Sequence, residues 1–443
     1  MGSCRTAEPT RPEPGRCYTA GSPRRGPALH PRPSSDRVTH LPQPQMPTAA
    51  PSPYDRTPPI PEIDPDRFPE PLRGIAAKVR GGERLDADDA TVCQTTPHLL
   101  HLGRLADAVR RRRHGEVAYY NLNRHINPTN VCVYTYNCKF CSFAAFKDEP
   151  HAWEMTHDEV YRRAAEQGGD EVTEFHIVGG LHPDWPMSWY EEMLRGLKER
   201  FPAVHLKAFT AIEIGWFAKR EKLSIEEVLG RLREAGLGSL PGGGAEIFHP
   251  EVREVICDGK LDADEWLEVH RVAHRMGIES NCTMLYGHVE RVEHRVDHLL
   301  RLRALQDEAP GFNAFIPLAY HPENNYLGLE HHTTGSEDLR QIATARLVLD
   351  NVPHVKAYWV MVTPKLAQVA LRFGADDLDG TVVEETIYHM AGAETAQQLT
   401  RGELERLVRE AGFRPVERDT LYRPIERSGE PAPAGATAAA VTG

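Results

Sequence analysis

Residues 173–191 read T-E-F-H-I-V-G-G-L-H-P-D-W-P-M-S-W-Y-E. The first six residues are rich in β-branched and aromatic side chains, which is typical of a short buried strand. Two glycines then mark a turn, and Ser188 stands three residues before Glu191, which is the spacing of a helix capping box. The stretch therefore predicts one unit of strand, loop and helix.

The same unit recurs along most of the chain. Further capping boxes are predicted at Thr156 with Glu159, Ser224 with Glu227, and Thr334 with Glu337. Strand-like runs cover residues 116–123, 173–178, 204–210, 237–240, 278–285, 312–318 and 355–360, with a weaker run at 379–383. Such alternation predicts parallel strands joined by crossover helices. The number of units favours an α/β fold of the (β/α) TIM-like barrel type, and a doubly wound sheet is the alternative.

Polar and glycine-rich segments follow most of the strand-like runs. They are the cysteine segment 132–141, residues 179–183, Glu213, residues 241–246, residues 286–288 and residues 320–324. In both candidate folds the carboxyl ends of the strands share one open face, where ligands bind. We therefore expect these segments to meet at one end of the fold and to form the functional site.

The cysteine segment reads C-V-Y-T-Y-N-C-K-F-C and holds three of the eight cysteines of the chain. Thiolates hold iron–sulfur clusters, and three of them would leave one iron of a four-iron cluster open to a small molecule. A zinc site would need a fourth, distant ligand, because no second C-x-x-C pair occurs. A redox pair would use Cys138 and Cys141 and leave Cys132 without a role. The pattern favours the cluster and leaves the other interpretations open.

Composition and charge limit the partners. The 443 residues carry a net charge of −12, and 40% of them are hydrophobic. No apolar run is long enough to span a membrane, and the cysteines are too sparse for a secreted disulfide scaffold. We therefore expect no nucleic-acid partner, no membrane contact and a cytoplasmic location. The basic run at residues 110–113 is interpreted as a solvated helix face or helix end, and a polyanion contact is the alternative.

The two ends of the chain differ in composition from the rest. Residues 1–70 hold about half of the 35 prolines and show no apolar periodicity, which predicts a disordered leader. Residues 426–443 are rich in Ala, Pro and Gly and are predicted to form a disordered tail. Between them we expect an N-terminal helical extension over residues 71–115 and the barrel over residues 116–425.

The cysteine segment resembles the loop of the radical S-adenosylmethionine (SAM) superfamily, with Phe140 at the aromatic position before the last cysteine. Its first gap has five residues where the usual spacing has three, so the loop has to bulge. Other stretches resemble the aminodeoxyfutalosine synthase family. They are F-H-I-V-G-G-L-H-P, L-K-A-F-T-A-I-E-I, P-G-G-G-A-E-I-F, C-T-M-L-Y-G-H-V-E, F-I-P-L-A-Y, N-V-P-H-V-K-A-Y-W-V-M and G-A-D-D-L-D-G-T-V-V-E, within residues 75–425.

This resemblance implies a radical SAM barrel and a transferase of menaquinone biosynthesis by the futalosine pathway. The enzyme would join SAM to 3-[(1-carboxyvinyl)oxy]benzoate and release 6-amino-6-deoxyfutalosine, methionine and carbon dioxide or bicarbonate. A reduced [4Fe–4S] cluster would cleave SAM, and the deoxyadenosyl radical would add to the vinyl ether rather than abstract hydrogen. SAM is then a co-substrate, and a one-electron donor such as flavodoxin or ferredoxin is the expected partner.

The resemblance also implies residues for the cluster and SAM. Cys132, Cys138 and Cys141 would ligate iron. Gly179 and Gly180 stand where the superfamily's second-strand glycine motif lets the backbone approach the methionyl group of SAM. That motif usually ends in Glu, and here Leu181 holds the place.

Four further residues are candidates for contacts with SAM or substrate, and they are Phe140, Glu213, Gly243 and Gly244. Glu213 could accept a hydrogen bond from the ribose or the amine. The glycines could allow close backbone approach to adenosine. A surface role for Glu213 and a plain turn for the glycines are the alternatives.

The substrate implied by the resemblance carries two carboxylates, so cationic or hydrogen-bonding side chains should face it. The candidates are His182, His288, His321, Arg346 and Lys356, and no catalytic residue is assigned. Asp376, Asp377 and Asp379 fit either an ion site or a turn. His270 with His274, and His294 with His298, have the spacing of a metal pair but are interpreted as solvated helix faces.

Two other kinds of function remain open. A dehypoxanthine futalosine cyclase or a deazaflavin (FO) synthase would share the architecture, and the cyclase would abstract hydrogen from a nucleoside instead. A zinc-stabilised barrel that binds a partner would not be an enzyme. A brown protein with absorption near about 400 nm would indicate the cluster, and a colourless zinc protein would indicate the binding module.

Overall fold

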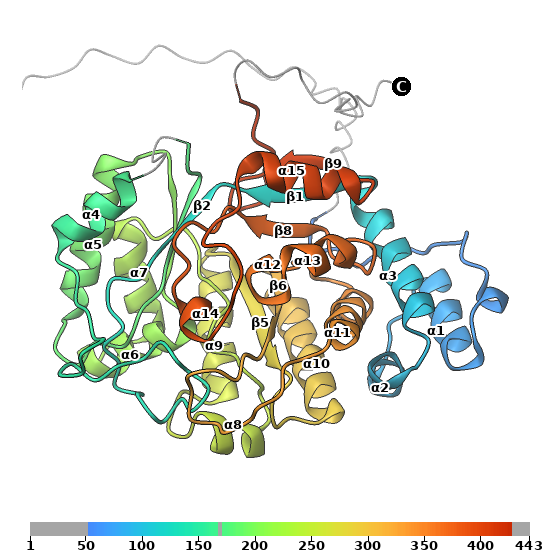
Figure 1. Cartoon of the computed structure of the whole chain (residues 1–443), viewed down its shortest axis with the longest axis horizontal. Helices are drawn as coiled ribbons and strands as arrows, with labels where there is room; N and C mark the ends of the chain where they lie inside the picture. Colours follow the sequence, from blue (N-terminus) through green and yellow to red (C-terminus); the bar gives the residue numbers. More distant parts are fainter. Residues whose placement is uncertain (1–51, 167–170, 428–443) are drawn as a thin grey trace, which may run out of the picture. The chain divides into compact units, whose positions relative to one another are not determined.

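The computed structural model describes residues 52–166 and 171–427. Its parallel strands lie in the interior with helices around them (Figure 1), and bridges between the sheets close them into a ring. The strands are β1 (Val117–Asn121), β2 (Asn123–Ile126), β3 (Glu174–Ile177), β4 (His205–Ala208), β5 (Ser280–Tyr286), β6 (Phe312–Ala319), β7 (His354–Val355), β8 (Asp377–Gly380) and β9 (Arg414–Glu417). The predicted (β/α) barrel is confirmed.

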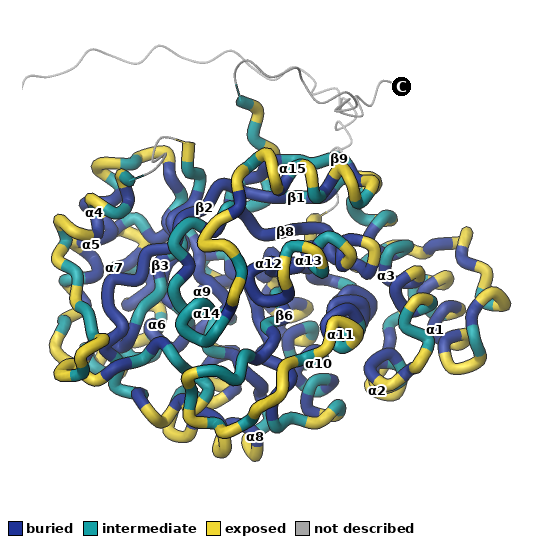
Figure 2. Tube along the Cα trace, viewed as in Figure 1, coloured by how far each residue is buried: buried dark blue, intermediate teal, exposed yellow. Residues whose placement is uncertain are grey.

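Helices precede, connect and cover the strands. They are the 3-10 helix η1 (Pro65–Arg67) and the α-helices α1 (Glu70–Gly81), α2 (Ala87–Thr95), α3 (Leu99–His114), α4 (His157–Ala165), α5 (Met187–Arg200), α6 (Ala211–Glu221), α7 (Ile225–Ala235), α8 (Pro250–Ile256), α9 (Ala263–Arg275), α10 (Val292–Glu308), α11 (Gly335–Val348), α12 (Trp359–Val362), α13 (Pro364–Ala370), α14 (Ile387–Met390) and α15 (Arg401–Glu410). Figure 2 shows the strands buried and the outer faces of many helices exposed.

The ring consists of three arcs with strand orders β2-β3-β4, β5-β6-β7 and β8-β1-β9. Short bridges join the arcs: Lys207 with Ser239 and Leu240 with Ser280, Lys356 with Asp377, and Arg124 with Val383. All four bridges are parallel. Because β1 and β2 follow each other directly, the bridge from β2 to the segment after β8 closes the ring. The carboxyl ends of the strands therefore surround one opening.

The predicted capping boxes can be compared with the residues at which the helices begin. Those of Thr156 and Ser224 are confirmed, because both side chains accept from the backbone three residues on and the partner carboxylates reach back. Thr334 caps α11, although Glu337 binds Arg295 instead of closing the box. The box at Ser188 is wrong. Pro186 holds the N-cap position of α5, and it makes no capping hydrogen bond because its side chain has no polar atom.

Three predicted strand runs differ from the structure, and one strand was missed. The first run divides at Leu122 into β1 and β2, and the run at 355–360 ends after Val355 and then turns into α12. Short apolar runs fit a buried helix turn as well as a strand, which explains this error. Residues 237–240 make only the isolated bridges. The edge strand β9 was not predicted, and Pro415 within it weakens the strand signal.

The segment before α1 is folded where it was predicted to be disordered. Ile60, Ile63 and Phe68 are buried in the core, and Thr57 donates a backbone hydrogen bond to Asp350 O. Three apolar anchors are enough to hold a proline-rich segment that has no periodicity. The prediction is therefore wrong for residues 52–70, while its remainder and most of the predicted tail lie outside the described residues.

The basic run lies at the end of α3, as one of its two interpretations expects, but only part of it is solvated, because Arg112 is exposed and Arg110 is buried. Arg110 is buried and donates to the carbonyl groups of Gly115 and Ala375. Arg113 donates to the carbonyl groups of Asp55 and Asp350. These arginines join the helical extension to the rest of the fold. Among the described residues, no helix is long and apolar enough to cross a membrane.

Candidate functional site

A cavity of about 270 Å³ lies at the carboxyl ends of the barrel strands. All nine residues predicted to bind the cluster or SAM line it, namely Cys132, Cys138, Phe140, Cys141, Gly179, Gly180, Glu213, Gly243 and Gly244. They come from segments up to about a hundred residues apart in the sequence. The folding of the barrel brings them together, as the strand rule predicts.

The cysteine loop is held by its own backbone. Cys132 N donates to Ala145 O at 3.0 Å, and Cys138 N donates to Tyr134 O at 3.0 Å. Cys141 N donates to Cys138 O at 2.9 Å, so the last two cysteines share one turn. Tyr136 takes a φ of 67° within the long first gap. This left-handed residue reverses the chain and lets the gap of five residues bulge.

The spacing of the thiols fits a cluster better than one zinc ion. Around a tetrahedral zinc with bonds of about 2.3 Å, sulfur atoms lie about 3.8 Å apart. Within the described part of the chain, no group of three potential ligand atoms within 4.8 Å of one another includes a cysteine. The three cysteines nevertheless line one cavity, as a wider four-iron cluster requires.

Lys260 is the cation next to the thiols. Burial raises the pKa of Cys132, Cys138 and Cys141, and the charge of Lys260 opposes this rise. Burial also disfavours the charge of Lys260, but Glu246 at 2.5 Å and the nearby thiols raise its pKa overall. A buried ammonium therefore favours the thiolate forms that bind iron. The sequence analysis missed Lys260, and no local motif marks it.

The glycines after β3 contact the cysteine loop through backbone atoms. Gly180 N donates to Thr129 O at 2.8 Å. A Cβ on Gly180 would lie 2.3 Å from Val131 O, and one on Gly179 would lie 3.0 Å from Thr129 O. Since the obstructing atoms belong to the backbone, no side-chain rotation could relieve the clash. These positions require glycine so that β3 can approach the cysteine loop.

Glu213 connects helix α6 to the same glycines. One of its oxygens accepts from Thr210 N at 2.7 Å and from Thr210 Oγ1 at 2.9 Å, which forms the capping box of α6. The other oxygen accepts from Gly179 N at 3.3 Å. Burial raises the pKa of the Glu213 carboxyl to about 7, although these hydrogen bonds lower it. A cation in the cavity would favour the ionised form.

The glycine loop after residue 240 forms another wall of the cavity. A Cβ on Gly242 would lie 2.7 Å from the Cα atom of Cys282, and Gly244 has a φ of +87°. A Cβ on Gly244 would also lie 2.3 Å from Ile212 Cγ1. Gly243 meets only Thr210 Cγ2, at 3.0 Å. Gly242 and Gly244 therefore have structural reasons to be glycine, and Gly243 has the most room.

The structure does not bring the substrate candidates to this cavity. His182 Nε2 bonds Glu154 Oε1 at 2.7 Å, and His288 Nε2 bonds Leu285 O at 3.1 Å. His321 Nε2 bonds Met361 O at 3.2 Å. Arg346 forms a buried ion pair with Asp376. Lys356 does not line the cavity either, although its ion-pair partner Asp379 does. Asp377 is paired with Arg418 at 2.5 Å.

Two histidines that the sequence analysis missed face the cavity. His125 on β2 and His176 on β3 are register partners whose rings stack at 4.6 Å between centroids. His125 Nε2 is buried, and among the described residues it has no hydrogen-bond partner. Burial lowers the pKa of His125 to about 3, so the ring is neutral. The detectable signal was a histidine at the matching position of two successive strands.

The four helix histidines predicted to be solvated are buried instead. His270 and His274 both bond Ser280 Oγ at 2.8 Å. His298 Nε2 bonds Thr283 O at 2.8 Å, and His294 packs against His249. The i, i+4 pattern marked the inner face of each helix, where imidazoles cap polar atoms of the barrel wall.

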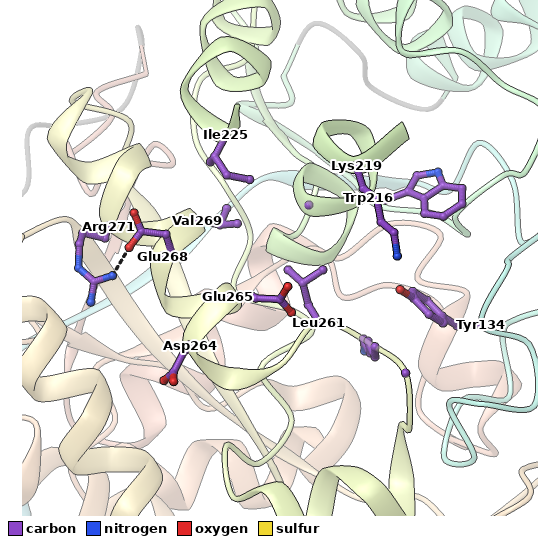
Figure 3. A pocket seen from close by; sticks show the side chains of 13 residues that line it. Tyr134, Trp216, Lys219, Ile225, Leu261, Asp264, Glu265, Glu268, Val269 and Arg271 are labelled. Carbon is purple, nitrogen blue, oxygen red and sulfur yellow. Dashed lines mark hydrogen bonds and ion pairs between the residues drawn. The ribbon is translucent and has the colours of Figure 1, made fainter. Parts of the chain in front are cut away.

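A second hollow of about 770 Å³ lies between α6, α9 and the segment before α9. Figure 3 shows Tyr134 and Lys219 on one side of it and the ion pair of Arg271 with Glu268 on the other. It shares Tyr134 and Lys260 with the barrel cavity. Its lining includes none of the three loop cysteines, so it is not the metal centre.

Comparison with known proteins agrees with this geometry. Residues 126–302 match the radical SAM superfamily, and residues 309–430 match the CofH/MqnC C-terminal region. An aminodeoxyfutalosine synthase of Thermus thermophilus is 49% identical over 355 residues, which cover 79% of this chain and 95% of the relative. One of Streptomyces coelicolor is 46% identical over 373 residues, which cover 82% and 96%.

The chain belongs to the aminodeoxyfutalosine synthase family of radical SAM enzymes. It is therefore an enzyme, which excludes the zinc-stabilised binding module. Its superfamily implies a [4Fe–4S] cluster and SAM. A cyclic dehypoxanthine futalosine synthase of Streptomyces coelicolor is 39% identical over 365 residues, which cover 82% of this chain and 90% of that relative. The crystal structure of methylornithine synthase shares the fold, with a TM-score of 0.60, 16% identity and coverage of 75% and 95%.

Proposed function

We propose that this enzyme joins the deoxyadenosyl group of SAM to 3-[(1-carboxyvinyl)oxy]benzoate. The products are 6-amino-6-deoxyfutalosine, methionine and the released carboxyl carbon as carbon dioxide or bicarbonate. The observation that carries the proposal is the meeting of three loop cysteines, the glycines after β3 and Glu213 around one cavity. The identity of 49% to a synthase, against 39% to a cyclase, favours addition over hydrogen abstraction.

Cys132, Cys138 and Cys141 hold the cluster in this proposal, and Lys260 favours their thiolate forms. When bound, the cluster supplies the electron that breaks the carbon–sulfur bond of SAM. With three protein thiolates as its ligands, the cluster would have room for the amine and carboxylate of the methionyl group. Cys257 pairs with Cys138 by a backbone bridge but does not line the cavity, so we do not assign it as a ligand.

SAM is positioned by backbone and carboxylate groups. Gly179 and Gly180 bring the segment after β3 against the backbone that leads into Cys132, and the methionyl group is held there. The Glu213 oxygen that faces Gly179 N accepts from the SAM amine or ribose. Gly243 and Gly244 let the loop after residue 240 approach the adenosine. Each contact is a hydrogen bond or a close backbone approach that orients the bond to be broken.

The substrate is held deeper in the barrel. His125 Nε2 is buried at the cavity and needs a partner, and in the tautomer that carries its proton on Nε2 the ring would donate to a substrate carboxylate. His176 stacks on His125 and fixes the orientation of the ring. Apolar walls, among them Ile316 and Leu318, exclude water and stray hydrogen donors from a primary radical.

Product analysis tests the reaction. Reconstituted, reduced enzyme is incubated without oxygen with SAM and the enolpyruvyl benzoate, and the nucleosides are separated and weighed by mass spectrometry. A covalent adenosyl adduct as the main product supports the synthase. Free 5'-deoxyadenosine as the main product, with substrate recovered, would contradict it and favour the cyclase reaction.

Iron analysis tests the metal assignment. Cys132→Ser, Cys138→Ser and Cys141→Ser should each lose most of the bound iron and the absorption near about 400 nm. Cys257→Ser is the matched control, because this thiol is also buried beside the loop. It should retain the iron. Equal loss in the control would show that a fourth thiolate closes the site.

The electron donor is proposed by chemical class. A one-electron protein donor such as flavodoxin or ferredoxin fits a reaction that starts with one electron at an iron–sulfur cluster. Turnover with a reduced donor protein should match or exceed turnover with a chemical reductant. A donor protein that gives no turnover while the chemical reductant does would remove this class.

A further inference from the structure

Two histidines and a glutamate gather beside the cavity in the segment after β6. One ring nitrogen of His321, one ring nitrogen of His332 and one carboxylate oxygen of Glu323 all lie within 4.8 Å of one another. His332 Nε2 and Glu323 Oε1 are 2.8 Å apart, and the two imidazole rings meet edge to face at 5.9 Å between centroids. The proposed synthase reaction uses none of the three side chains.

The hydrogen bonds of this cluster leave acceptors without donors. His321 Nε2 bonds Met361 O at 3.2 Å, which fixes the proton on that nitrogen because a carbonyl can only accept. His321 Nδ1 is then a lone pair. It is buried, and it has no hydrogen-bond partner among the residues that the structure describes. The same holds for Glu323 Oε2. Two buried acceptors without donors, on two side chains of one cluster, call for a cation or for water.

The surrounding segment holds these side chains in place. Asn325 Nδ2 donates to His321 O at 3.0 Å, and Asn324 Nδ2 donates to Met390 O at 3.0 Å. Gly392 has a φ of +92°, and a Cβ there would lie 2.7 Å from Glu323 Cβ and 2.8 Å from Glu323 Oε2. Gly392 therefore leaves the space that the Glu323 carboxylate occupies. The three side chains of the cluster come from residues 321–332, and Gly392, about 70 residues after Glu323, packs against one of them.

We propose that His321, Glu323 and His332 bind one divalent transition-metal ion. Two imidazoles and one carboxylate are a ligand set typical of zinc and related first-row ions, with the remaining positions left to water. A ligating histidine normally donates its other N–H to a carbonyl or carboxylate, as His321 does to Met361. Binding replaces the ion pair of His332 with Glu323 by two metal–ligand bonds.

The position of this ion gives it a structural role at the cavity rim. Ser142, next to Cys141, donates its hydroxyl to Glu323 O at 2.9 Å. His321 also lies 6.3 Å from Tyr388, ring centroid to centroid, and Tyr388 lines the cavity. The ion would thus order the segment after β6, which itself contacts the cysteine loop through Ser142 and α14 through Tyr388. It orders the rim without entering the reaction.

The test uses the holoenzyme, with the cluster filling the cysteine site. The protein is treated with a chelator that leaves the cluster intact, and Zn²⁺ alone is then titrated by calorimetry, with zinc and iron per chain measured by mass spectrometry. Wild type should bind one zinc per chain in addition to the cluster iron. His321→Ala, Glu323→Gln and His332→Ala should each weaken the affinity at least about tenfold.

His331→Ala is the matched control, because His331 is exposed, adjacent to His332 and outside the ligand group. It should bind zinc as wild type does. Thermal unfolding provides a second measurement: zinc should raise the melting temperature of wild type and His331→Ala but not of Glu323→Gln. Each variant's melting temperature without zinc shows whether it is folded.

Three outcomes would overturn the proposal. They are a wild type that takes up no zinc beyond its cluster, a Glu323→Gln that keeps wild-type affinity, and a His331→Ala that loses it. The first outcome would mean that water satisfies the two acceptors. A chain in which Ser replaces Cys132, Cys138 and Cys141 should still bind zinc at the same affinity. The metal site and the synthase proposal can therefore fail independently.

Discussion

Gly180→Ala should separate the cysteine loop from β3. The added Cβ would lie 2.3 Å from Val131 O, 2.7 Å from Val131 C and 2.8 Å from Asn130 C. Ordinary contact starts at 3.4 Å, so the two segments have to move apart by about 1 Å. All three obstructing atoms are backbone atoms of the segment that leads directly into Cys132. The displacement is therefore passed on to the first iron ligand.

The size of the effect follows from this distance. Forcing one extra methyl group into packed backbone costs about 1–3 kcal/mol of unfolding free energy. Metal–ligand bonds tolerate errors of only about 0.2 Å, which is several times less than the required shift. We expect Gly180→Ala to fold with reduced stability and to lose at least half of its iron after reconstitution. The loss of iron should exceed what the loss of stability explains.

Denaturant unfolding and iron and sulfide analysis of the reconstituted protein measure both effects. Gly230→Ala is the matched control, because Gly230 lies inside α7 and nothing lies within 4 Å of its added Cβ. Gly230→Ala should leave the iron content unchanged and raise the free energy of unfolding by up to about 1 kcal/mol. A Gly180→Ala variant that binds as much iron as wild type and unfolds at the same denaturant concentration would refute the predicted clash with the backbone of Val131.

Three other substitutions give further expectations. The pKa of the Glu213 carboxyl is 4.5 in the unfolded chain and about 7 in the folded protein. The protonated carboxyl therefore stabilises the fold fully below pH 4.5, and this stabilisation is lost as the pH rises through 7. Glu213→Gln should remove a decline of about 3 kcal/mol over that range in ligand-free protein, and a decline that persists in the variant would contradict this cause. SAM affinity of the wild type should rise with pH through 7, because a cation favours the carboxylate, and isothermal titration at several pH values checks it. Lys260→Met leaves Glu246 buried without its cation and should lower the free energy of unfolding, measured with denaturant, by about 3–5 kcal/mol. Adding Glu246→Gln should restore much of that free energy. Equal losses in the single and the double variant would argue against the ion pair as the cause. His125→Phe should raise the KM for the enolpyruvyl benzoate by about tenfold or more with iron content unchanged, and an unaltered KM would remove His125 from the substrate contacts.

Local motifs explain why much of the fold and the site could be predicted. A capping box such as Thr156 with Glu159 is complete within four residues, so the sequence contains the whole interaction. The cysteine loop and the glycines after β3 are also continuous stretches, and the barrel rule is enough to place them at one opening. Ser188 shows the limit, because a proline two residues earlier took the capping position.

Interactions across the barrel could not be predicted from the sequence. Arg346 looked like a free cation for a carboxylate, but it is paired with Asp376, which is 30 residues away. Lys260 approaches the thiols only after α8 has brought its segment beside Cys138. Such ion pairs depend on which strands and loops become neighbours in the folded barrel. A single sequence does not contain this information. The same reason explains why His125 was missed, because its cavity-facing position depends on the direction of the strand.

The three-arc construction of the ring has a mechanical consequence. Within the arc of β5 and β6, seven residue pairs hold the strands in register, whereas Ser239 and Leu240 each provide one bridge to a neighbouring strand. Backbone amides at this seam should exchange with deuterium before those of β5 and β6. Local opening of the barrel would then start between β4 and β5, where residues 239 and 240 make the only bridges among the described residues. The glycine loop that follows these residues belongs to the part of the wall that opens first.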